Sequence, residues 1–234
     1  MTTRRVNVNT ESVDNYLKAI FALGGAEEGR VASTALAERL GVAPASITNM
    51  LQKLASASPP LVQYERHKGV RLSPGGRSRA LEIVRHHRLL EAFLYEVLNY
   101  PIEEVHDEAE RLEHFISERL EERIDVKLGR PRFDPHGHCI PALDGRMPKQ
   151  HAMPLTGGAN GESVIVESIS DQDASTLKQL KAKDITPGVR LQIKRRNVDG
   201  TFAITIGDSS KVLNISHQVA MAIKIHPAKD HHPE

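Results

Sequence analysis

Two adjoining stretches decide the fold of the first part of this sequence: "STALAERLGVAPASITNMLQKLASAS" (residues 33–58) and "LVQYERHKGVRLSPGGR" (residues 61–77). In the first stretch, apolar residues recur at helical spacing on both sides of Gly41, and Pro44 suits the first turn of a second helix. In the second stretch, two short apolar runs flank a polar turn at residues 67–69. The sequence therefore predicts a helix, a tight turn, a second helix and a β-hairpin.

A β-hairpin directly after such a helix pair makes a winged helix. The second helix of this unit enters the major groove of double-stranded DNA, while the hairpin and the helix ends contact phosphate. Helix-turn-helix segments also occur in proteins that never touch DNA, but the hairpin and its basic tip favour DNA binding. The candidate base-reading residues are Ser46, Thr48 and Asn49, and the candidate phosphate contacts are Lys53, Arg66, Lys68 and Arg71.

Composition limits the class of protein. The chain has 234 residues, a formal net charge of +1 and a single cysteine, Cys139, which excludes an internal disulfide framework and a cysteine-built zinc site. No run approaches the length of a membrane span, and the start "MTTRRVNVNTES" lacks the apolar core of a secretory signal. We therefore expect a cytoplasmic protein that does not enter a membrane.

The rest of the chain divides into a helical segment and a β-rich segment. Residues 77–128 predict two long amphipathic helices separated by "NYPIEE", with apolar stripes that need covering, so we expect a dimerisation layer and a homodimer. A long connection rich in proline and glycine follows. The five short β-branched runs beyond it predict a small SH3-like β-barrel without room for a catalytic crevice or a small-molecule substrate.

The second of these helices contains the stretch "VHDEAERLEH" (residues 105–114). On a helical wheel His106, Glu110, Glu113 and His114 share an arc of about 100° along the edge of the apolar stripe. The preceding helix repeats the pattern, because His87 and Glu91 are four residues apart. Taken alone, the stretch is more typical of a solvated charged face, but matching pairs on two neighbouring helices favour a site for a first-row divalent metal.

With these motifs in place, the chain resembles the diphtheria toxin repressor family of iron- and manganese-dependent transcriptional regulators. The likeness runs from residue 10 to residue 225 and rests on "VHDEAERLEH", supported by "RHHRLLE" (residues 85–91) and "DPHGHCIP" (residues 134–141). The fold class that it implies is mainly α with β: a winged helix-turn-helix, a helical metal-binding and dimerisation domain, and a C-terminal SH3-like domain. The predicted boundaries are 1–75 for the DNA-binding domain, 76–145 for the helical domain, 146–160 for a linker, 161–226 for an SH3-like domain similar to FeoA, and 227–234 for a disordered tail.

The resemblance also implies two metal positions in each subunit. The ancillary position would use His87, Glu91 and His106 with Asp173 from the SH3-like domain, and the regulatory position would use Glu110, Glu113 and His114 with Asn15. Asp14 or water is the alternative to Asn15. Iron-sensing relatives carry cysteine where Glu110 stands, so the resemblance implies Mn²⁺, with Fe²⁺ as the alternative.

The expected function is a DNA-binding regulator of metal-homeostasis genes, with metal as the corepressor of a homodimer and without enzyme activity. Two alternatives stay open on the sequence alone. One is a winged-helix regulator that ignores metals, and the other is a dinuclear metallohydrolase.

Overall fold

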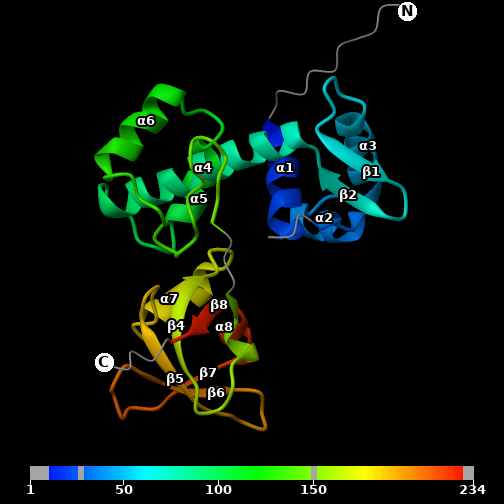
Figure 1. Ribbon diagram of the computed structural model, residues 1–234. Coiled ribbons are helices and arrows are strands. Elements are labelled where there is room, and N and C mark those ends of the chain that lie inside the picture. The colour runs from blue at the N-terminus through cyan, green and yellow to red at the C-terminus, as the bar shows by residue number, and fades with distance from the viewer. Residues whose placement is uncertain (1–10, 26–28, 149–151, 229–234) are drawn as a thin grey trace, which may run out of the picture. The chain divides into compact units, whose positions relative to one another are not determined.

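The computed structural model describes residues 11–25, 29–148 and 152–228 (Figure 1). The chain forms two compact units, each with a core of its own. The first unit is made of Met1–His87, Leu112–Ser117 and Pro141–Lys149, and the second is made of Arg88–Arg111, Glu118–Ile140 and Gln150–Glu234. Residues 229–234 of the expected tail lie outside the described residues.

The first unit is built on the predicted winged helix. Its elements are α1 (Glu11–Gly24), α2 (Ser33–Leu40), α3 (Pro44–Ala55), β1 (Val62–Glu65) and β2 (Gly69–Leu72), followed by the start of α4 (Pro74–Glu96). Gly41 ends α2 with a φ of 64°, a left-handed conformation that glycine adopts without strain. Leu17, Leu36 and Leu51 are fully buried in the shared core of α1, α2 and α3. The helix-turn-helix and hairpin are as expected.

The wing is a tight antiparallel hairpin. β1 and β2 pair from Val62 opposite Leu72 to Glu65 opposite Gly69. Val31 forms an isolated antiparallel bridge to the hairpin, because its backbone exchanges N–H···O bonds of 2.7 and 2.9 Å with Val70. This packing holds the wing against the helices of the first unit.

The middle segment differs from the two long helices that we expected. Helix α4 begins at Pro74, where the hydroxyl of Ser73 accepts a hydrogen bond of 3.1 Å from the backbone N–H of Gly76. The second helix is divided into α5 (Val105–Leu112) and α6 (Glu118–Lys127). The expected apolar stripe is also interrupted, because Leu112 and Leu120 are exposed. The chain leaves the helix at Glu113, whose side chain is fully buried among groups of the first unit.

The second unit contains the SH3-like domain. Its elements after α6 are β3 (Met153–Pro154), the 3-10 turn η1 (Leu155–Gly157), β4 (Ser163–Ile169), α7 (Ala174–Lys181), β5 (Arg190–Arg196), β6 (Phe202–Ile206), β7 (Leu213–Ile215), α8 (His217–Met221) and β8 (Ile223–Pro227). The strands form an antiparallel sheet in the order β3-β8-β4-β5-β6-β7. Within the described residues the two edge strands do not pair, so the sheet is open and does not form the closed barrel that we expected. β3 and η1 lie in the segment that we expected to be a linker.

Ile102, in the turn before α5, packs into the core of this sheet domain. The contact fixes the start of α5 against the domain within the second unit. Over the described ranges, no helix is both long and apolar enough to span a membrane.

The loop at residues 131–140, which we expected to be an irregular connection, has a defined conformation. Phe133 and Cys139 form an isolated antiparallel bridge, and one carboxylate oxygen of Asp134 accepts backbone hydrogen bonds from His136 (2.8 Å) and His138 (2.9 Å). The backbone N–H of Ile169 in β4 donates to the carbonyl oxygen of His136 at 2.9 Å. The loop is therefore attached to the sheet.

Gly137 allows this attachment. Its φ is +88°, and a Cβ added there would lie 2.2 Å from the carbonyl oxygen of Glu167. We expect Gly137→Ala to lower the free energy of unfolding by about 2 kcal/mol or more, because the left-handed backbone and the clash both oppose the methyl group. The midpoint of thermal unfolding measures the loss.

Gly188→Ala is the matched control. Gly188 has a φ of +86°, but a Cβ there would meet no atom of the described residues within 4 Å. It should show only the cost of the left-handed conformation, about 1 kcal/mol. Equal losses in the two variants would show that the approach of the loop to β4 does not constrain the fold.

Candidate metal centres and DNA-binding surface

The side chains expected to read DNA bases lie on α3. Ser46 and Asn49 are exposed, and Thr48 is half-buried. The hydroxyl of Thr48 donates to the carbonyl oxygen of Pro44 at 3.2 Å, so its hydrogen is used within the helix. Ser46 and Asn49 are therefore the more available groups for a base edge.

The basic residues of the wing are partly paired. Nζ of Lys68 lies 2.8 Å from Oε2 of Glu65, and the guanidinium of Arg30 contacts the same carboxylate. The hydrogen bond from Lys68, with the charges of Arg30 and Lys68, lowers the pKa of the Glu65 carboxyl. Arg66 is exposed at the tip, and Lys53 is half-buried on α3. One carboxylate faces several cations, so the wing keeps its basic character.

The first candidate metal centre is organised around Glu113. This residue follows the last turn of α5, and its side chain is 0% exposed. The ammonium nitrogen of Lys18 lies 2.8 and 2.7 Å from the two carboxylate oxygens, and Nδ1 of His87 lies 2.6 Å from Oε2. A lysine cation therefore shares this carboxylate with an imidazole.

His114 connects the same turn to α1. Its Nε2 lies 2.9 Å from Oδ1 of Asn15 and 3.4 Å from Oε1 of Glu113. Its buried Nδ1 makes no hydrogen bond within the described part of the chain, and the nearest carboxylate oxygen, Oδ2 of Asp14, is 3.7 Å away. Nδ1 of His114 is therefore a buried polar atom whose hydrogen-bonding capacity a metal or a water could satisfy.

Asp14 is held by Arg79, whose Nε donates to Oδ1 at 2.6 Å. Burial acts to raise the pKa of Asp14, but the nearby His114 imidazole and the hydrogen-bonded guanidinium of Arg79 outweigh it and hold that pKa below its ordinary value. Asp14 thus already has a cationic partner. The oxygen of Asn15 is the α1 group that makes the shorter contact with His114.

Glu110 lies on α5, half-buried, one turn after His106 and one turn before Glu113. His106 and Glu110 share a helical face, as the wheel predicted. Glu113 and His114 follow the end of the helix, so their positions come from the turn and not from helical periodicity.

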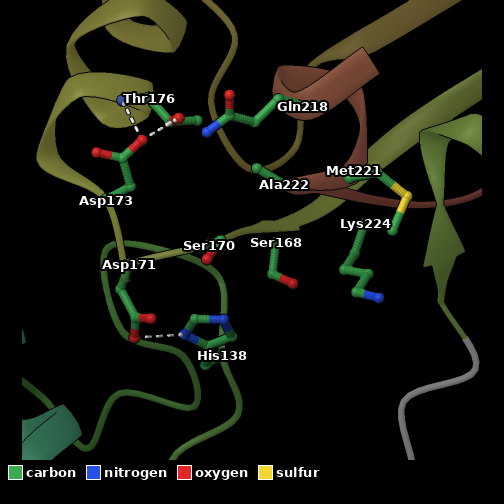
Figure 2. A pocket seen from close by; sticks show the side chains of 10 residues that line it. All are labelled: His138, Ser168, Ser170, Asp171, Asp173, Thr176, Gln218, Met221, Ala222 and Lys224. Atoms are coloured by element: carbon green, nitrogen blue, oxygen red, sulfur yellow. Dashed lines mark hydrogen bonds and ion pairs between the residues drawn. The ribbon is translucent and has the colours of Figure 1, made fainter. Parts of the chain in front are cut away.

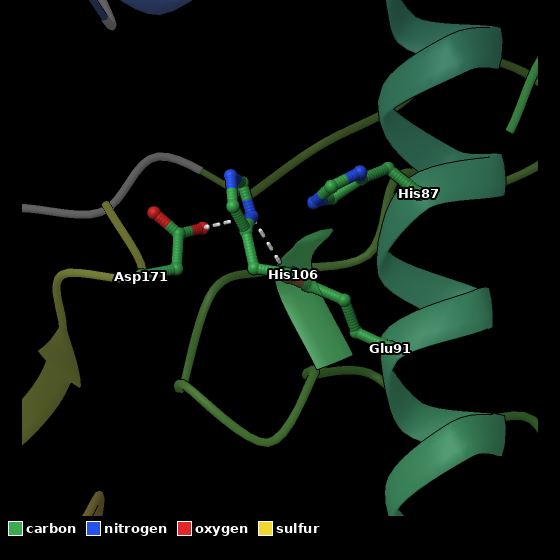
Figure 3. A group of neighbouring side chains, drawn as sticks. All are labelled: His87, Glu91, His106 and Asp171. Carbon is green, nitrogen blue, oxygen red and sulfur yellow. Dashed lines mark hydrogen bonds and ion pairs between the residues drawn. The ribbon is translucent and has the colours of Figure 1, made fainter. Parts of the chain in front are cut away.

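The second candidate centre lies in the second unit (Figure 3). Nδ1 of His106 is 3.3 Å from Oε1 of Glu91 and 3.6 Å from Oδ2 of Asp171. Potential ligand atoms of these three residues all lie within 4.8 Å of one another. His87 and Glu91 project from the same side of α4, as their spacing predicts. An imidazole thus stands between two carboxylates.

The loop with Gly137 adds three more potential ligands: Asp134, His136 and His138. Nδ1 of His136 lies 3.6 Å from Oε1 of Glu91. The buried Nδ1 of His136 and Oδ2 of Asp134 make no hydrogen bond with any described residue. Among the described residues, Oδ2 of Asp134 has only ion-pair neighbours, at 3.3 Å from Nδ1 of His138 and 3.7 Å from Nε of Arg88. Buried polar atoms without hydrogen bonds are costly, and a cation at this position would satisfy them.

The charges of these groups affect one another. Burial acts to lower the pKa of His136, but the close approach of Glu91 and the charges of Glu91, Asp134 and Asp171 raise it to about 9. Burial also opposes protonation of His138, yet the neighbouring Asp134 and Asp171 raise its pKa. The carboxylates of the second centre therefore stabilise positive charge at its imidazoles.

Asp173, the expected ligand from the SH3-like domain, has a different role. Its carboxylate caps α7 by accepting from the backbone N–H groups of Ser175 (3.0 Å) and Thr176 (3.2 Å), and from the Thr176 hydroxyl at 2.6 Å (Figure 2). Asp171, two residues earlier, points toward His138, and its Oδ2 lies 3.7 Å from Nδ1 of that histidine. Asp171 is the acidic residue of this segment that reaches the cluster.

Sequence reasoning did not identify Lys18, Asp171 or the ligands of the loop. The loop carried a usable signal, since "DPHGHC" places an aspartate and two histidines within five positions. Its proline and glycine content instead favoured a connection. Lys18 carried no signal, because a lysine on an amphipathic helix is ordinary until its partner is known.

The donor atoms indicate the chemistry of both centres. They are carboxylate and amide oxygens and imidazole nitrogens, a set that suits first-row divalent metals. Cys139 is buried, and burial raises the pKa of its thiol, which disfavours a thiolate ligand.

Family models match three consecutive parts of the chain. Residues 9–70 match the iron dependent repressor N-terminal DNA binding domain, and residues 73–142 match the iron dependent repressor metal binding and dimerisation domain. Residues 153–227 match the FeoA domain.

Individual relatives extend over nearly the whole chain. The iron-dependent repressor IdeR of Mycobacterium leprae is 29% identical, with 94% of this chain and 99% of that protein covered. The diphtheria toxin repressor of Corynebacterium diphtheriae is 28% identical, with 92% and 96% covered. A solved structure of a manganese-dependent transcriptional repressor in complex with manganese is 38% identical, covers 92% of this chain and 99% of its own, and has a TM-score of 0.84.

These relatives are transcriptional repressors and not enzymes, which removes the metallohydrolase alternative. The chain belongs to the iron-dependent, or diphtheria toxin, repressor family and is a metal-responsive, DNA-binding transcriptional regulator.

Proposed function

We propose that this protein is a manganese-responsive regulator of metal-homeostasis genes, in which two metal ions per subunit act as corepressors of a homodimer on operator DNA. The observation that carries the proposal is the contact of His114 with Asn15 at 2.9 Å. It joins the turn after α5 to α1 of the winged helix, so a metal bound there would act on the DNA-binding domain.

The regulatory site would use Glu113 and His114, with Asn15 from α1 and Glu110 from the last turn of α5. Burial of Glu113 and the unused Nδ1 of His114 support it. His87, whose Nδ1 is 2.6 Å from Glu113, would assist. When bound, the metal supplies a rigid multivalent link between these groups, and the protein supplies the ligands and their orientation.

The second site would use Glu91, His106 and Asp171, with His136 from the loop. Asp171 replaces Asp173 in this assignment, because Asp173 caps α7. Asp134 and His138 would stabilise the ligands through charge and hydrogen bonding.

Manganese is preferred to iron for two reasons. The regulatory donors are oxygen-rich, and Glu110 stands where iron-sensing relatives carry cysteine. The relative with the 38% identical solved structure is named as manganese-dependent. Fe²⁺ is the second candidate, since the curated relatives are iron-dependent repressors.

The coupling between metal and DNA follows from population shift. An ion that binds more tightly when α1 and the α5 turn are correctly placed stabilises the DNA-competent arrangement. A coupling free energy of about 1.4 kcal/mol is enough for a tenfold gain in operator affinity. The homodimer, supported by the dimerisation-domain match, would present two recognition helices to adjacent half-sites.

The first test concerns Glu110. In Glu110→Gln, we expect the gain in DNA affinity caused by Mn²⁺ to be smaller than the wild-type gain by a factor of about ten or more. DNA binding without metal should be unchanged. Fluorescence anisotropy with an operator selected from random-sequence DNA measures both, with Mn²⁺ and with chelator.

Glu108→Gln on the same helix is the control, because Glu108 pairs with Arg111 at 3.2 Å on the solvated face. It should keep the full response to Mn²⁺. A full response in Glu110→Gln as well would remove Glu110 from the regulatory site.

The second test concerns α3. Asn49→Ala should weaken binding of the metal-loaded protein to its operator by about 1–3 kcal/mol and relax the base preference at one position. Asn214→Ala, an exposed asparagine of β7, is the control and should bind normally. Equal operator affinity in both variants would exclude Asn49 from base recognition.

The third test uses the protonation of His136. Its pKa of about 9 means that the metal-free imidazole is protonated at pH 7, whereas a metal ligand must be neutral. Metal binding should therefore release a proton, and apparent affinity should fall as the pH drops below about 9.

Calorimetry of Mn²⁺ binding at pH 7.5 in two buffers of different ionisation enthalpy counts the released protons. His136→Gln should release about one proton fewer. The same proton count in variant and wild type would show that His136 does not lose a proton to the metal.

A further inference from the structure

The ammonium group of Lys18 lies against Glu113 and His87 in the regulatory cluster. It lies 2.7 and 2.8 Å from the two oxygens of Glu113 and 3.4 Å from Nδ1 of His87. The Glu113 carboxylate is 0% exposed, and the Lys18 side chain is 16% exposed. A positive charge thus stands against the Glu113 carboxylate, which is a ligand of the proposed regulatory site, and against the neighbouring His87.

We propose that Lys18 is a built-in cation of the regulatory site, and that a divalent metal binds there only by displacing it. The inference rests on the proposed function, because it concerns the same site. It goes further by naming the residue that sets the metal concentration at which the regulator responds.

Competition follows from geometry and charge. Both oxygens of Glu113 are within hydrogen-bond distance of Nζ, so a metal bound by this carboxylate would stand within a few ångströms of the ammonium. Two cations so close together in a buried place repel each other strongly. The metal and the ammonium group are therefore alternatives.

The lysine also explains how a fully buried carboxylate is tolerated without metal. An uncompensated buried charge is strongly destabilising, and the ion pair removes that penalty. Because the ammonium group ends a flexible four-carbon stem, it can turn toward solvent when a divalent ion arrives. Arg79 on Asp14, by contrast, is a planar group held by a directed hydrogen bond of 2.6 Å.

The test compares Lys18→Gln with the wild type. Glutamine keeps a hydrogen-bond donor for Glu113 but removes the charge. We expect half-saturation of the regulatory site at a Mn²⁺ concentration about tenfold lower, because no cation has to be displaced. Both proteins carry His106→Gln, so that the second site does not contribute, and the electron paramagnetic resonance signal of free Mn²⁺ measures binding.

Lys18→Met repeats the measurement without a donor, and Lys211→Gln, which removes the charge of an exposed lysine, is the control for net charge. The control should bind Mn²⁺ like the wild type. A second measurement is thermal unfolding: Lys18→Gln should melt lower than the wild type without metal, and Mn²⁺ should raise its midpoint more.

Mn²⁺ binding by Lys18→Gln that equals or is weaker than wild-type binding would overturn the inference, because a merely structural lysine would not oppose the metal. If the wild type still shows a Mn²⁺-dependent gain in DNA affinity, the proposed function survives that result. If neither protein binds Mn²⁺, both the proposed function and the inference fail.

Discussion

The fully buried carboxylate of Glu113 must be compensated by a cation, and side chains from two helices of the first unit meet at it. Lys18 approaches it from α1 and His87 from α4, while the adjacent His114 reaches Asn15. These contacts tie the turn after α5 to the winged helix. The end of α5 at Leu112 agrees with this constraint, since a helix continuing through Glu113 would follow its own periodicity and not these partners. The electrostatic requirement of one side chain thus accompanies a break in secondary structure.

The fold was predictable where local sequence rules agree with one another. Gly41 and Pro44 mark the helix-turn-helix, and the polar turn between two apolar runs marks the wing. The single long helix expected after "NYPIEE" was wrong, because the structure has α5 and α6 there and periodicity does not register the tertiary demand at Glu113. The sheet order was also beyond the sequence, since β3 has two residues and its pairing with β8 depends on partners about seventy positions away.

The candidate ligands divide in the same way. His87 with Glu91, and His106 with Glu110, were predictable because helical spacing alone puts each pair on one face. Asp171 was not, because two aspartates in one short segment cannot be ranked until one of them is seen to cap α7. His136 depends on a glycine that lets its loop approach β4, a relation between segments far apart in sequence. Ligand pairs within one helix could be predicted from the sequence, whereas contacts between distant segments could be identified only in the structure.

The two centres prepare for a divalent ion by different physical means. In the second unit, one buried polar atom each of Asp134 and His136 has no hydrogen bond to the described part of the chain, and the surrounding carboxylates raise the pKa of His136 so that a proton provides the positive charge. In the first unit, a lysine ammonium provides it. The proton and the lysine each compensate the buried negative charge when no metal is bound. Each also reduces the net free energy of metal binding, because the metal replaces a cation that is already there. Affinity can then be moderate even though each metal–ligand bond is strong. A site with moderate affinity responds to a change in free metal instead of staying saturated, as the coupling of metal to DNA binding requires.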